Sequence, residues 1–319
     1  EAINKTLIAS ILAIIGIFQE CCYLADFKYG YDYSWFVQKW KLITPPPGTL
    51  MRVSSIFMEP SHLAISMAPA MFVSMITLLK KDYSYLGEKA SIVIIICYIL
   101  TFSAVAYIAI TISLSLAFFS VKKLRKTKYL LSTLLILIIF VFVACCCIPE
   151  TKKRFDDIIK VTSGAMPITN SHGTVYAYAS NAFVALKSFI KNPFLGSGLG
   201  SHPISYVAFI TSNDASIFRG DYAGINMADA NCLFLRLISE TGLFGIGVVF
   251  YFIIRFFIKT STNKTLQVIN NSILILFITQ LIRQGHYFYN GLFFFVWLYY
   301  FAYTINSKPD LAIPETKRH

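Results

Sequence analysis

Ionisable side chains at the edges of long apolar runs are the residues of this sequence best suited to chemistry. Glu59 and His62 flank Pro60 just before such a run, and Pro60 fits the first turn of a helix. An ionisable group at membrane depth is costly, which makes it a candidate for function. Two plainer interpretations stay open: Glu59 as an acid that complements a helix dipole, and His62 as a buried, hydrogen-bonded histidine.

A second candidate pair is Arg236 and Glu240, four residues apart inside the apolar run 232–257. On a helix the two side chains share one face, so they could form a structural salt bridge or take part in binding a substrate. The remaining candidates lie near the ends of apolar runs: Arg52, His202, Arg219, Asn231, Arg283, His286 and Tyr287.

A glycine-rich stretch, Gly196-Ser-Gly198-Leu-Gly200, leads directly to Ser201 and His202. Such glycines permit tight turns or a close approach of the backbone to a phosphate. The stretch is not a nucleotide-binding fingerprint, because no strand precedes it and no acidic partner follows. A plain turn and a phosphate contact both stay open.

The elements that must position these residues follow from the composition. The 319 residues carry a net charge of +12, yet 56% are hydrophobic and only 14% are charged. Soluble domains contain about 45–50% apolar and about 25% charged residues. The chain is therefore expected to be an integral membrane protein, and its basic charge is not read as a nucleic-acid partner.

The apolar runs predict an all-α bundle of about eight transmembrane helices. Six clear candidate spans are 6–24, 60–79, 129–148, 232–257, 268–284 and 291–306. The stretch 90–121 is long for one helix and short for two. Lysines and arginines lie on both its flanks, and short basic loops stay cytoplasmic, so we expect a hairpin of two helices turning near Ser103. The alternative is one long tilted helix.

This topology places the loops 80–89, 122–128 and 258–267 inside, and 25–58, 149–230 and 285–290 outside. Within the large outer loop, 149–230, we expect an amphipathic interfacial stretch at 151–160, a loop at 162–174 and a surface helix at 176–190. We treat 1–319 as a single membrane domain. Its start at Glu1, close to an apolar run, predicts further helices upstream.

Seven cysteines, Cys21, Cys22, Cys97, Cys145, Cys146, Cys147 and Cys232, lie in or beside the apolar runs. None shows the spacing of a metal site, so we read them as small packing residues and expect neither a metal nor a cofactor.

Four short stretches, in this order, make the sequence resemble the O-antigen polymerase and ligase superfamily. They are 52–64, with Glu59-Pro60-Ser61; 192–200, with the glycines; 231–245, with Glu240-Thr-Gly242; and the closing helix pair that begins with the helix of Arg283. The likeness covers roughly residues 50–300.

The resemblance implies a metal-independent membrane glycosyltransferase that uses an undecaprenyl-diphosphate-linked oligosaccharide. It would act on the outer face of a bacterial inner membrane, with membrane lipids and a chain-length regulator as further partners. Glu59 is then the first candidate base, followed by His62, and Arg52, Arg219 and Arg283 are expected to clamp the diphosphate. The residues expected to bind substrate are Arg52, His202, Asn231, Arg236, Glu240, His286 and Tyr287.

The Glu59-Pro60-Ser61 form of the first stretch resembles polymerases of O-antigen or capsular repeat units more than lipopolysaccharide ligases. The chain also departs from the superfamily pattern in two places, and the first departure makes a ligase less favoured. Ligases typically have a His-Asn pair where this chain has Ala230-Asn231. An arginine common before the glycine motif is replaced around Ser180–Asn181. A ligase that uses a lipid A-core or protein acceptor is the first alternative. A polysaccharide transporter, which should show internal repeats or broken helices, is the second.

Overall fold

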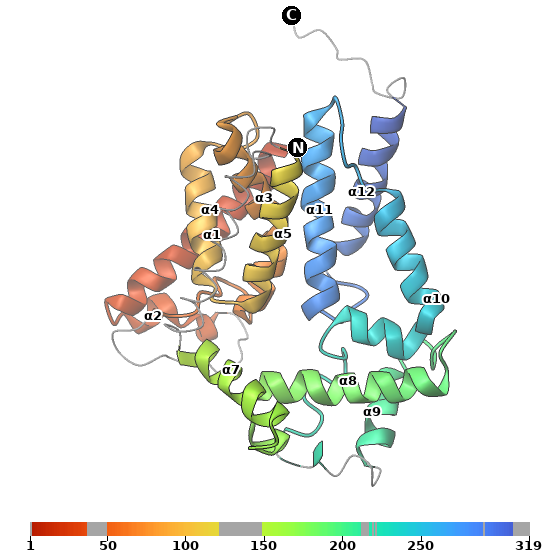
Figure 1. Cartoon of the computed structure of the whole chain (residues 1–319). Helices are drawn as coiled ribbons and strands as arrows, with labels where there is room; N and C mark the ends of the chain where they lie inside the picture. The colour runs from red at the N-terminus through yellow and green to blue at the C-terminus, as the bar shows by residue number, and fades with distance from the viewer. Residues whose placement is uncertain are drawn as a thin grey trace, which may run out of the picture. The chain divides into compact units, whose positions relative to one another are not determined.

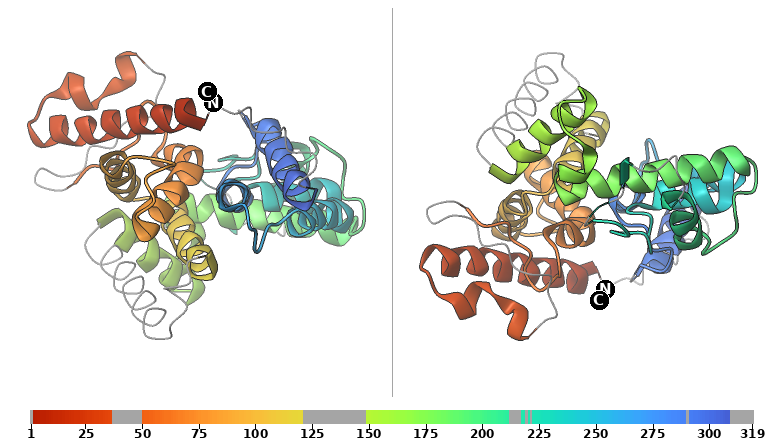
Figure 2. Two further views of the ribbon diagram at one scale, coloured as in Figure 1. Left: turned by 90° about the horizontal axis from the view of Figure 1, so that it is seen from above. Right: turned by 90° about the horizontal axis from the view of Figure 1, so that it is seen from below.

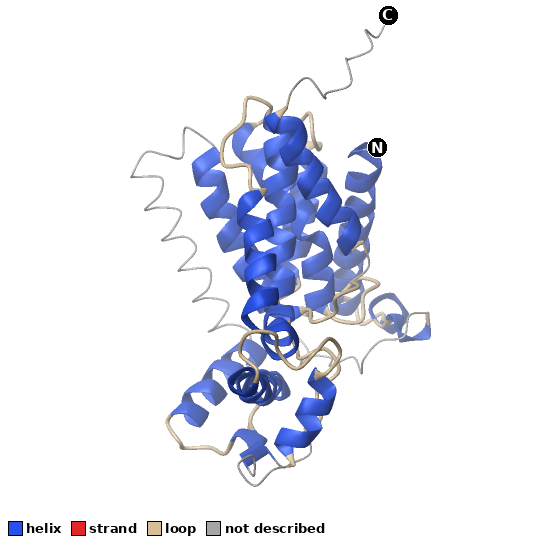
Figure 3. Ribbon diagram, turned by 90° about the vertical axis from the view of Figure 1, so that its right-hand side faces the viewer, coloured by secondary structure: helices blue, strands red, loops and turns tan. Residues whose placement is uncertain are grey.

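A computed structural model of the protein describes residues 2–36, 50–120, 149–211, 217–218, 220, 222–289 and 291–308. Regular structure in these ranges is entirely helical, which confirms the all-α prediction (Figure 3). The expected span 129–148, Arg219 and Cys145–Cys147 lie outside the described residues.

Contacts divide the chain into two units, which we describe one at a time. Unit 1 comprises Glu1–Leu134, Phe256–Thr279 and Leu292–His319, and unit 2 comprises Leu135–Arg255 and Gln280–Gly291. The single membrane domain stays a prediction.

Unit 1 contains most of the predicted apolar helices together with a short helix, α2, that was not predicted. They are α1 (Ala2–Leu24), α2 (Lys28–Tyr31), α3 (Pro60–Lys80), α4 (Glu88–Leu100), α5 (Ala104–Ser120), the first four turns of α11 (Lys264–Arg283), and α12 (Leu292–Ser307). Among the described residues, four helical stretches are long and apolar enough to cross a membrane: Leu7–Leu24, Pro60–Lys80, Leu233–Arg255 and Lys264–Arg283.

The stretch 90–121 forms two helices, as predicted. α4 ends at Leu100 and α5 begins at Ala104, and between them Phe102 adopts a left-handed conformation (φ 43°). The amide of Val53 donates a hydrogen bond to the carbonyl of Leu100 (3.0 Å), which ties the loop before α3 to this turn. The alternative of one long tilted helix is therefore wrong.

Small side chains line the helix contacts of unit 1. Ala13, Ala64, Ala68 and Ala106 are fully buried, and α3 packs against both α4 and α5 (Figure 2). Small residues let membrane helices approach closely, where dispersion contacts replace the missing hydrophobic driving force. Cys97 is buried in the same cluster, which agrees with its interpretation as a packing residue.

The loop before α3 is held by an amide side chain of α1. Gln19 is fully buried, its Oε1 accepts hydrogen bonds from the amides of Ser54 (3.1 Å) and Ser55 (2.9 Å), and its Nε2 donates to the carbonyl of Tyr31 (2.9 Å). A buried amide that satisfies three backbone groups fixes the path of the chain through residues 51–55.

Unit 2 contains the large loop that was expected outside the membrane. Its helices are α7 (Pro149–Thr162), α8 (Gly173–Lys191), α9 (His202–Ile210), α10 (Leu233–Arg255) and the last turn of α11. α8 confirms the surface helix expected at 176–190, and α7 covers the stretch expected to be amphipathic at 151–160, whereas α9 was not predicted. α8 packs against α9 and α10 (Figure 1).

α10 is not the single continuous span predicted over 232–257. At Gly242 the backbone leaves the helical region (φ 59°, ψ −153°), and the ribbon of α10 changes direction in Figure 1. We call this point the helix break. A residue with a side chain would be strained there, because φ lies in the left-handed region that glycine tolerates.

The helix break is held open by the stretch Pro193–Gly200, which we call the glycine loop. Two amides beyond the break donate to the loop: Leu243 to the carbonyl of Pro193 (2.9 Å) and Phe244 to that of Phe194 (3.0 Å). Two carbonyls before the break accept from it: Ser239 from the amide of Ser197 (3.0 Å) and Glu240 from that of Gly198 (2.9 Å). The loop thus replaces hydrogen bonds that an unbroken helix would make within itself.

Candidate functional site

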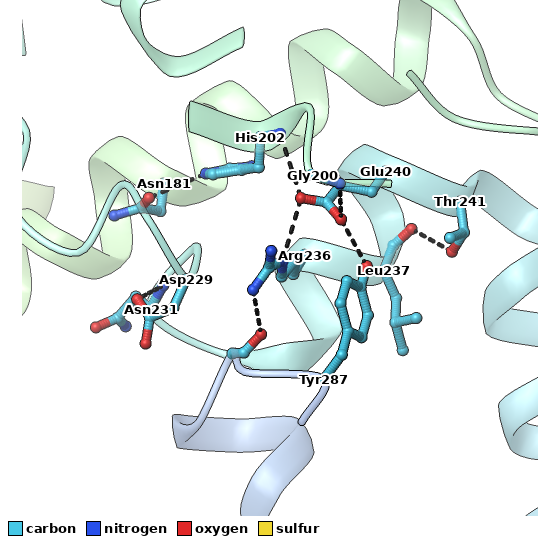
Figure 4. Close-up of polar contacts among 11 residues, drawn as sticks. Asn181, Gly200, His202, Asp229, Asn231, Arg236, Leu237, Glu240, Thr241 and Tyr287 are labelled. Carbon is cyan, nitrogen blue, oxygen red and sulfur yellow. Dashed lines mark hydrogen bonds and ion pairs between the residues drawn. The ribbon is translucent and has the colours of Figure 1, made fainter. Parts of the chain in front are cut away.

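The carboxylate of Glu240 is the centre of the main polar cluster of unit 2 (Figure 4). Its side chain is completely buried, in α10, two residues before the helix break. One oxygen accepts hydrogen bonds from Arg236 Nε (3.1 Å) and the amide of His202 (3.3 Å). The other accepts from the amide of Gly200 (2.9 Å) and the hydroxyl of Tyr287 (2.8 Å). Four donors compensate the burial of this charge.

Arg236 is held on three sides. It forms the i,i+4 salt bridge with Glu240, donates from Nη1 to the carbonyl of Gly285 (3.0 Å), and lies over the ring of Tyr287, 4.5 Å from its centroid (Figure 4). The predicted salt bridge is therefore present. Because the charge of Arg236 is compensated within the protein, the geometry favours a structural role, and substrate binding by Arg236 or Glu240 stays a prediction.

The hydroxyl of Tyr287 is the donor to Glu240 that comes from the turn after α11. Burial raises the pKa of Tyr287 above its ordinary value, and the hydrogen bond to the Glu240 carboxylate acts in the same direction. The phenol therefore stays protonated and donates to Glu240 at any physiological pH.

His202 begins α9 and is fully buried. Its Nε2 lies 3.0 Å from Asn181 Oδ1, while Asn181 Nδ2 donates to the carbonyls of Ala177 (2.8 Å) and Ile225 (3.1 Å). These two bonds fix Asn181 so that its oxygen faces the imidazole, and a neutral His202 must then carry its proton on Nε2. Among the described residues, Nδ1 of His202 has no hydrogen-bond partner.

The same burial lowers the pKa of His202 to about 4. The charge of Glu240 raises the pKa and that of Arg236 lowers it, but desolvation is the larger effect. His202 is therefore neutral at neutral pH.

A second polar cluster lies at the start of α10, around Asn231. The Asn231 side-chain oxygen accepts from Arg283 Nη1 (3.1 Å) and from Asn226 Nδ2 (2.7 Å), and the Asn231 backbone amide donates to Asp229 Oδ1 (3.1 Å). Ala230 and Asn231 both have left-handed backbones (φ 55° and 64°), which fold this turn tightly before the helix. Asn231 therefore orients the guanidinium at the end of α11.

Gly285 lets the turn after α11 approach this cluster closely. A Cβ atom at Gly285 would lie 1.5 Å from the carbonyl oxygen of Asp229, so no larger residue fits. Beside it, Tyr178 of α8 donates to the carbonyl of Ile282 (2.6 Å), and burial raises the pKa of this tyrosine to about 12. The Arg283 end of α11 is thus fixed to both α8 and the turn before α10.

The structure assigns the other sequence candidates to different places. Arg52, Glu59 and His62 belong to unit 1, where Pro60 starts α3 and the Glu59 carbonyl accepts the amides of His62 (3.1 Å) and Leu63 (3.3 Å). Pro60 lies in the first turn of α3, so the predicted helix start is confirmed, and the Glu59 carboxylate accepts a hydrogen bond from the Ser61 hydroxyl (2.8 Å).

In unit 2, His286 is exposed, beside Tyr287. The expected roles of Arg52, Glu59, His62 and His286 stay predictions.

Sequence reasoning did not identify Asn181 or Gly200 as members of the Glu240 cluster. The available signal for Asn181 was its position as a lone asparagine on the apolar face of α8, because a buried amide needs several partners. Gly200 belonged to the glycine motif, but its amide donates to Glu240, which no sequence spacing indicates. Among the described residues, no group of three or more His, Cys, Asp or Glu side chains could hold a metal ion.

Comparison with known proteins gives one match. A family model described as O-antigen ligase matches residues 90–250, about half of the 319-residue chain. The chain belongs to the O-antigen ligase family. The matched range covers most of α4, all of α5 and most of unit 2, including the glycine loop and the Glu240 cluster except Tyr287. No curated protein and no solved structure matches the chain.

Members of the O-antigen ligase family are glycosyltransferase-like membrane enzymes of bacteria, and both polymerases and ligases fit this description. The resemblance noted in the sequence is therefore confirmed at the level of the superfamily. The chain is a membrane protein of this enzyme type, with apolar helices long enough to cross a bilayer.

Proposed function

We propose that the protein polymerises oligosaccharide repeat units carried on undecaprenyl diphosphate, on the outer face of the bacterial inner membrane. The observation that carries this proposal is the Arg283 guanidinium, half-buried at the end of α11 and oriented by Asn231. A diphosphate leaves readily only when its charge is neutralised, and an arginine does so with fixed hydrogen bonds.

Arg236 and Arg283 are held by different kinds of group. Arg236 is compensated by the buried carboxylate of Glu240, whereas Asn231 orients Arg283 through a neutral amide. The hydrogen bond to Asn231 fixes the planar fork of Arg283, whose geometry matches that of a phosphate.

In the proposed reaction an acceptor hydroxyl oxygen attacks the anomeric carbon of the donor sugar. The bond from that carbon to the diphosphate oxygen breaks, the diphosphate leaves with the electron pair, and the hydroxyl proton passes to a base. Glu59 is the first candidate for this base. Because Glu59 belongs to unit 1 and Arg283 to unit 2, Glu59→Gln tests the base in an experiment separate from the substitution of Arg283. Direct displacement inverts the anomeric carbon, so the new linkage should have the opposite configuration to the lipid linkage.

The turn before α10 supports a polymerase over a ligase. Where ligases of the superfamily have a His-Asn pair, this chain has Ala230-Asn231, and Ala230 is fully buried with no titratable group. The Glu59-Pro60-Ser61 form of the first motif favours the same assignment.

The test is to incubate the purified full chain, reconstituted in liposomes, with one synthetic lipid-linked repeat unit and no other acceptor. We expect longer lipid-linked oligomers with inverted linkages. Extension that occurs only after a lipid A-core or protein acceptor is added would replace the polymerase with a ligase. A product with retained configuration would refute direct displacement.

A transporter was the remaining alternative, and α10 shows one of its expected features, a broken helix. The family match favours an enzyme. Translocation of the lipid-linked unit across the liposome membrane without any oligomer formation would support the transporter.

A further inference from the structure

The glycine loop presents large apolar side chains that the protein leaves uncovered. Phe194, Leu195 and Leu199 are 71%, 73% and 76% exposed. The polar groups of the same stretch point inward: the amides of Ser197, Gly198 and Gly200 all donate to α10 or to Glu240. A loop in water usually shows the opposite arrangement, with its polar groups in the solvent.

These side chains adjoin an apolar stripe on α10. Beyond the helix break, Leu243, Phe244, Val248, Tyr251 and Ile254 of α10 are all exposed. The backbone bonds from Leu243 and Phe244 to Pro193 and Phe194 place the glycine loop at the start of this stripe. The medium that surrounds the stripe, whether water or lipid, therefore also surrounds the loop.

Helix length gives the depth of the loop. From Leu243 to the basic end at Arg255, α10 rises only about 20 Å at 1.5 Å per residue. The hydrocarbon core of a bilayer is about 30 Å thick. With Arg255 at one interface, where arginine head groups settle, the helix break lies about 10 Å short of the other interface. Tilting α10 would bring the break deeper still.

We propose that the glycine loop is embedded in the acyl chains of the leaflet opposite Arg255, with Phe194, Leu195 and Leu199 in contact with lipid hydrocarbon. Irregular backbone survives at such depth only where the protein itself pairs its polar groups. The four backbone bonds between the loop and the helix break provide this pairing. The occupant of this surface is the bilayer, and the proposal does not depend on the reaction catalysed.

The test uses tryptophan fluorescence of the full chain in phosphatidylcholine–phosphatidylglycerol liposomes. The three native tryptophans are replaced by phenylalanine, and Phe194→Trp, Leu195→Trp and Leu199→Trp are made one at a time. Val248→Trp, on the exposed stripe of α10, is the reference for hydrocarbon. Lys308→Trp, at an exposed position after α12, is the reference for water. If the tryptophan-free chain does not fold, each variant is instead compared with the parent protein.

We expect lipids brominated along their acyl chains to quench all three loop tryptophans nearly as strongly as Val248→Trp. Aqueous iodide should quench them far less than Lys308→Trp. Strong iodide quenching without bromolipid quenching would place the loop in water and overturn the proposal. Protection from both quenchers would mean that a protein surface, such as a second copy of the chain, covers the loop, and would overturn it equally.

Discussion

Both oxygens of the Glu240 carboxylate are occupied by donors from three separate stretches of the chain: α10 itself, the segment from Gly200 to His202, and the turn after α11. A buried carboxylate with this many partners joins those stretches more effectively than any apolar contact of similar size, because losing one partner exposes an uncompensated charge. At the residue scale, unit 2 is therefore expected to be sensitive to substitution of Glu240.

Glu240→Gln should lower the stability of the protein by about 3–5 kcal/mol, the usual cost of removing one partner of a buried ion pair. The glutamine side chain would not compensate the charge of Arg236. Its NH₂ group would also face hydrogen-bond donors that now point at the carboxylate. Thermal unfolding in detergent measures the effect. Glu88→Gln, at an exposed position at the start of α4, is the matched control and should stay within about 0.5 kcal/mol of the parent. Equal losses of stability in Glu240→Gln and Glu88→Gln would contradict the description of Glu240 as a buried, paired carboxylate.

His202 makes stability depend on pH in a defined window. With a folded-state pKa of about 4 against about 6.5 in the unfolded chain, only the unfolded chain binds a proton at this site between those values. Stability is therefore complete above about pH 6.5 and falls as the pH drops toward 4, by about 3 kcal/mol at most.

Unfolding midpoints of the parent and of His202→Gln, measured from pH 7 to pH 4, isolate this effect from the titration of carboxylates. Glutamine can still donate to Asn181 but does not titrate, so the variant should lose less stability over the window. Parallel curves for the two proteins would mean that His202 is not buried as described.

Arg283→Ala should reduce oligomer formation by about 100-fold or more, the effect of removing a donor aimed at developing charge. Arg283→Lys should recover only part of the activity, because lysine keeps the charge but not the planar fork. The assay with the lipid-linked repeat unit measures both, and Lys308→Ala is the control. Full activity of Arg283→Ala would remove this residue from the proposed mechanism.

Sequence alone predicted the Arg236–Glu240 pair, because spacing along a helix decides whether two side chains meet. It could not predict that Gly200, His202 and Tyr287 share the same carboxylate, because these residues lie about 40 residues away on either side. Contacts of that separation depend on how helices pack, which no local pattern records.

At the scale of elements, the helix break and the glycine loop depend on each other. A Cβ at Gly242 would lie 2.6 Å from the carbonyl oxygen of Pro193, and a Cβ at Gly196 would lie 2.3 Å from the carbonyl carbon of Glu240. Both contacts are with backbone, which cannot move aside without breaking the four bonds between the two segments. Glycine is therefore required on each side of the junction.

Gly242→Ala should destabilise the protein by several kcal/mol, because it combines a clash with a left-handed backbone. Gly247→Ala, five residues further along the same helix, should be neutral or stabilise by up to about 1 kcal/mol, since its Cβ would meet open space and alanine favours helices. Unfolding midpoints of the two variants in the same detergent test this. Similar unfolding midpoints for Gly242→Ala and Gly247→Ala would argue against a helix break at Gly242.

The elements themselves were predictable to different degrees. Long apolar runs and the charges around them indicated α3 and the hairpin of α4 and α5, because each segment must cross or re-cross the bilayer whatever its neighbours do. The break in α10 left no such signal. Gly242 lies within an apolar run that resembles a continuous span, and only the docked glycine loop explains its conformation.

At the scale of the whole molecule, the charged loops predict which side of the membrane each segment faces. An epitope inserted in the loop 82–87 should be inaccessible to antibody in intact spheroplasts, because Lys80, Lys81 and Lys89 hold it on the cytoplasmic side. An epitope at 163–166, in the loop after α7, should be accessible. The opposite pattern would invert the topology and place the Arg283 end of α11 inside.

The broken form of α10 also bears on how the protein is made. As it leaves the ribosome, Leu233–Arg255 is an unbroken apolar segment of 23 residues, enough to enter the bilayer as a straight helix about 35 Å long. Arg236 and Glu240 would then enter the lipid as part of that helix. The glycine loop has already been synthesised by that time. Its docking at Gly242 would turn the first half of the segment aside, so we expect assembly of unit 2 to end with a late rearrangement inside the membrane.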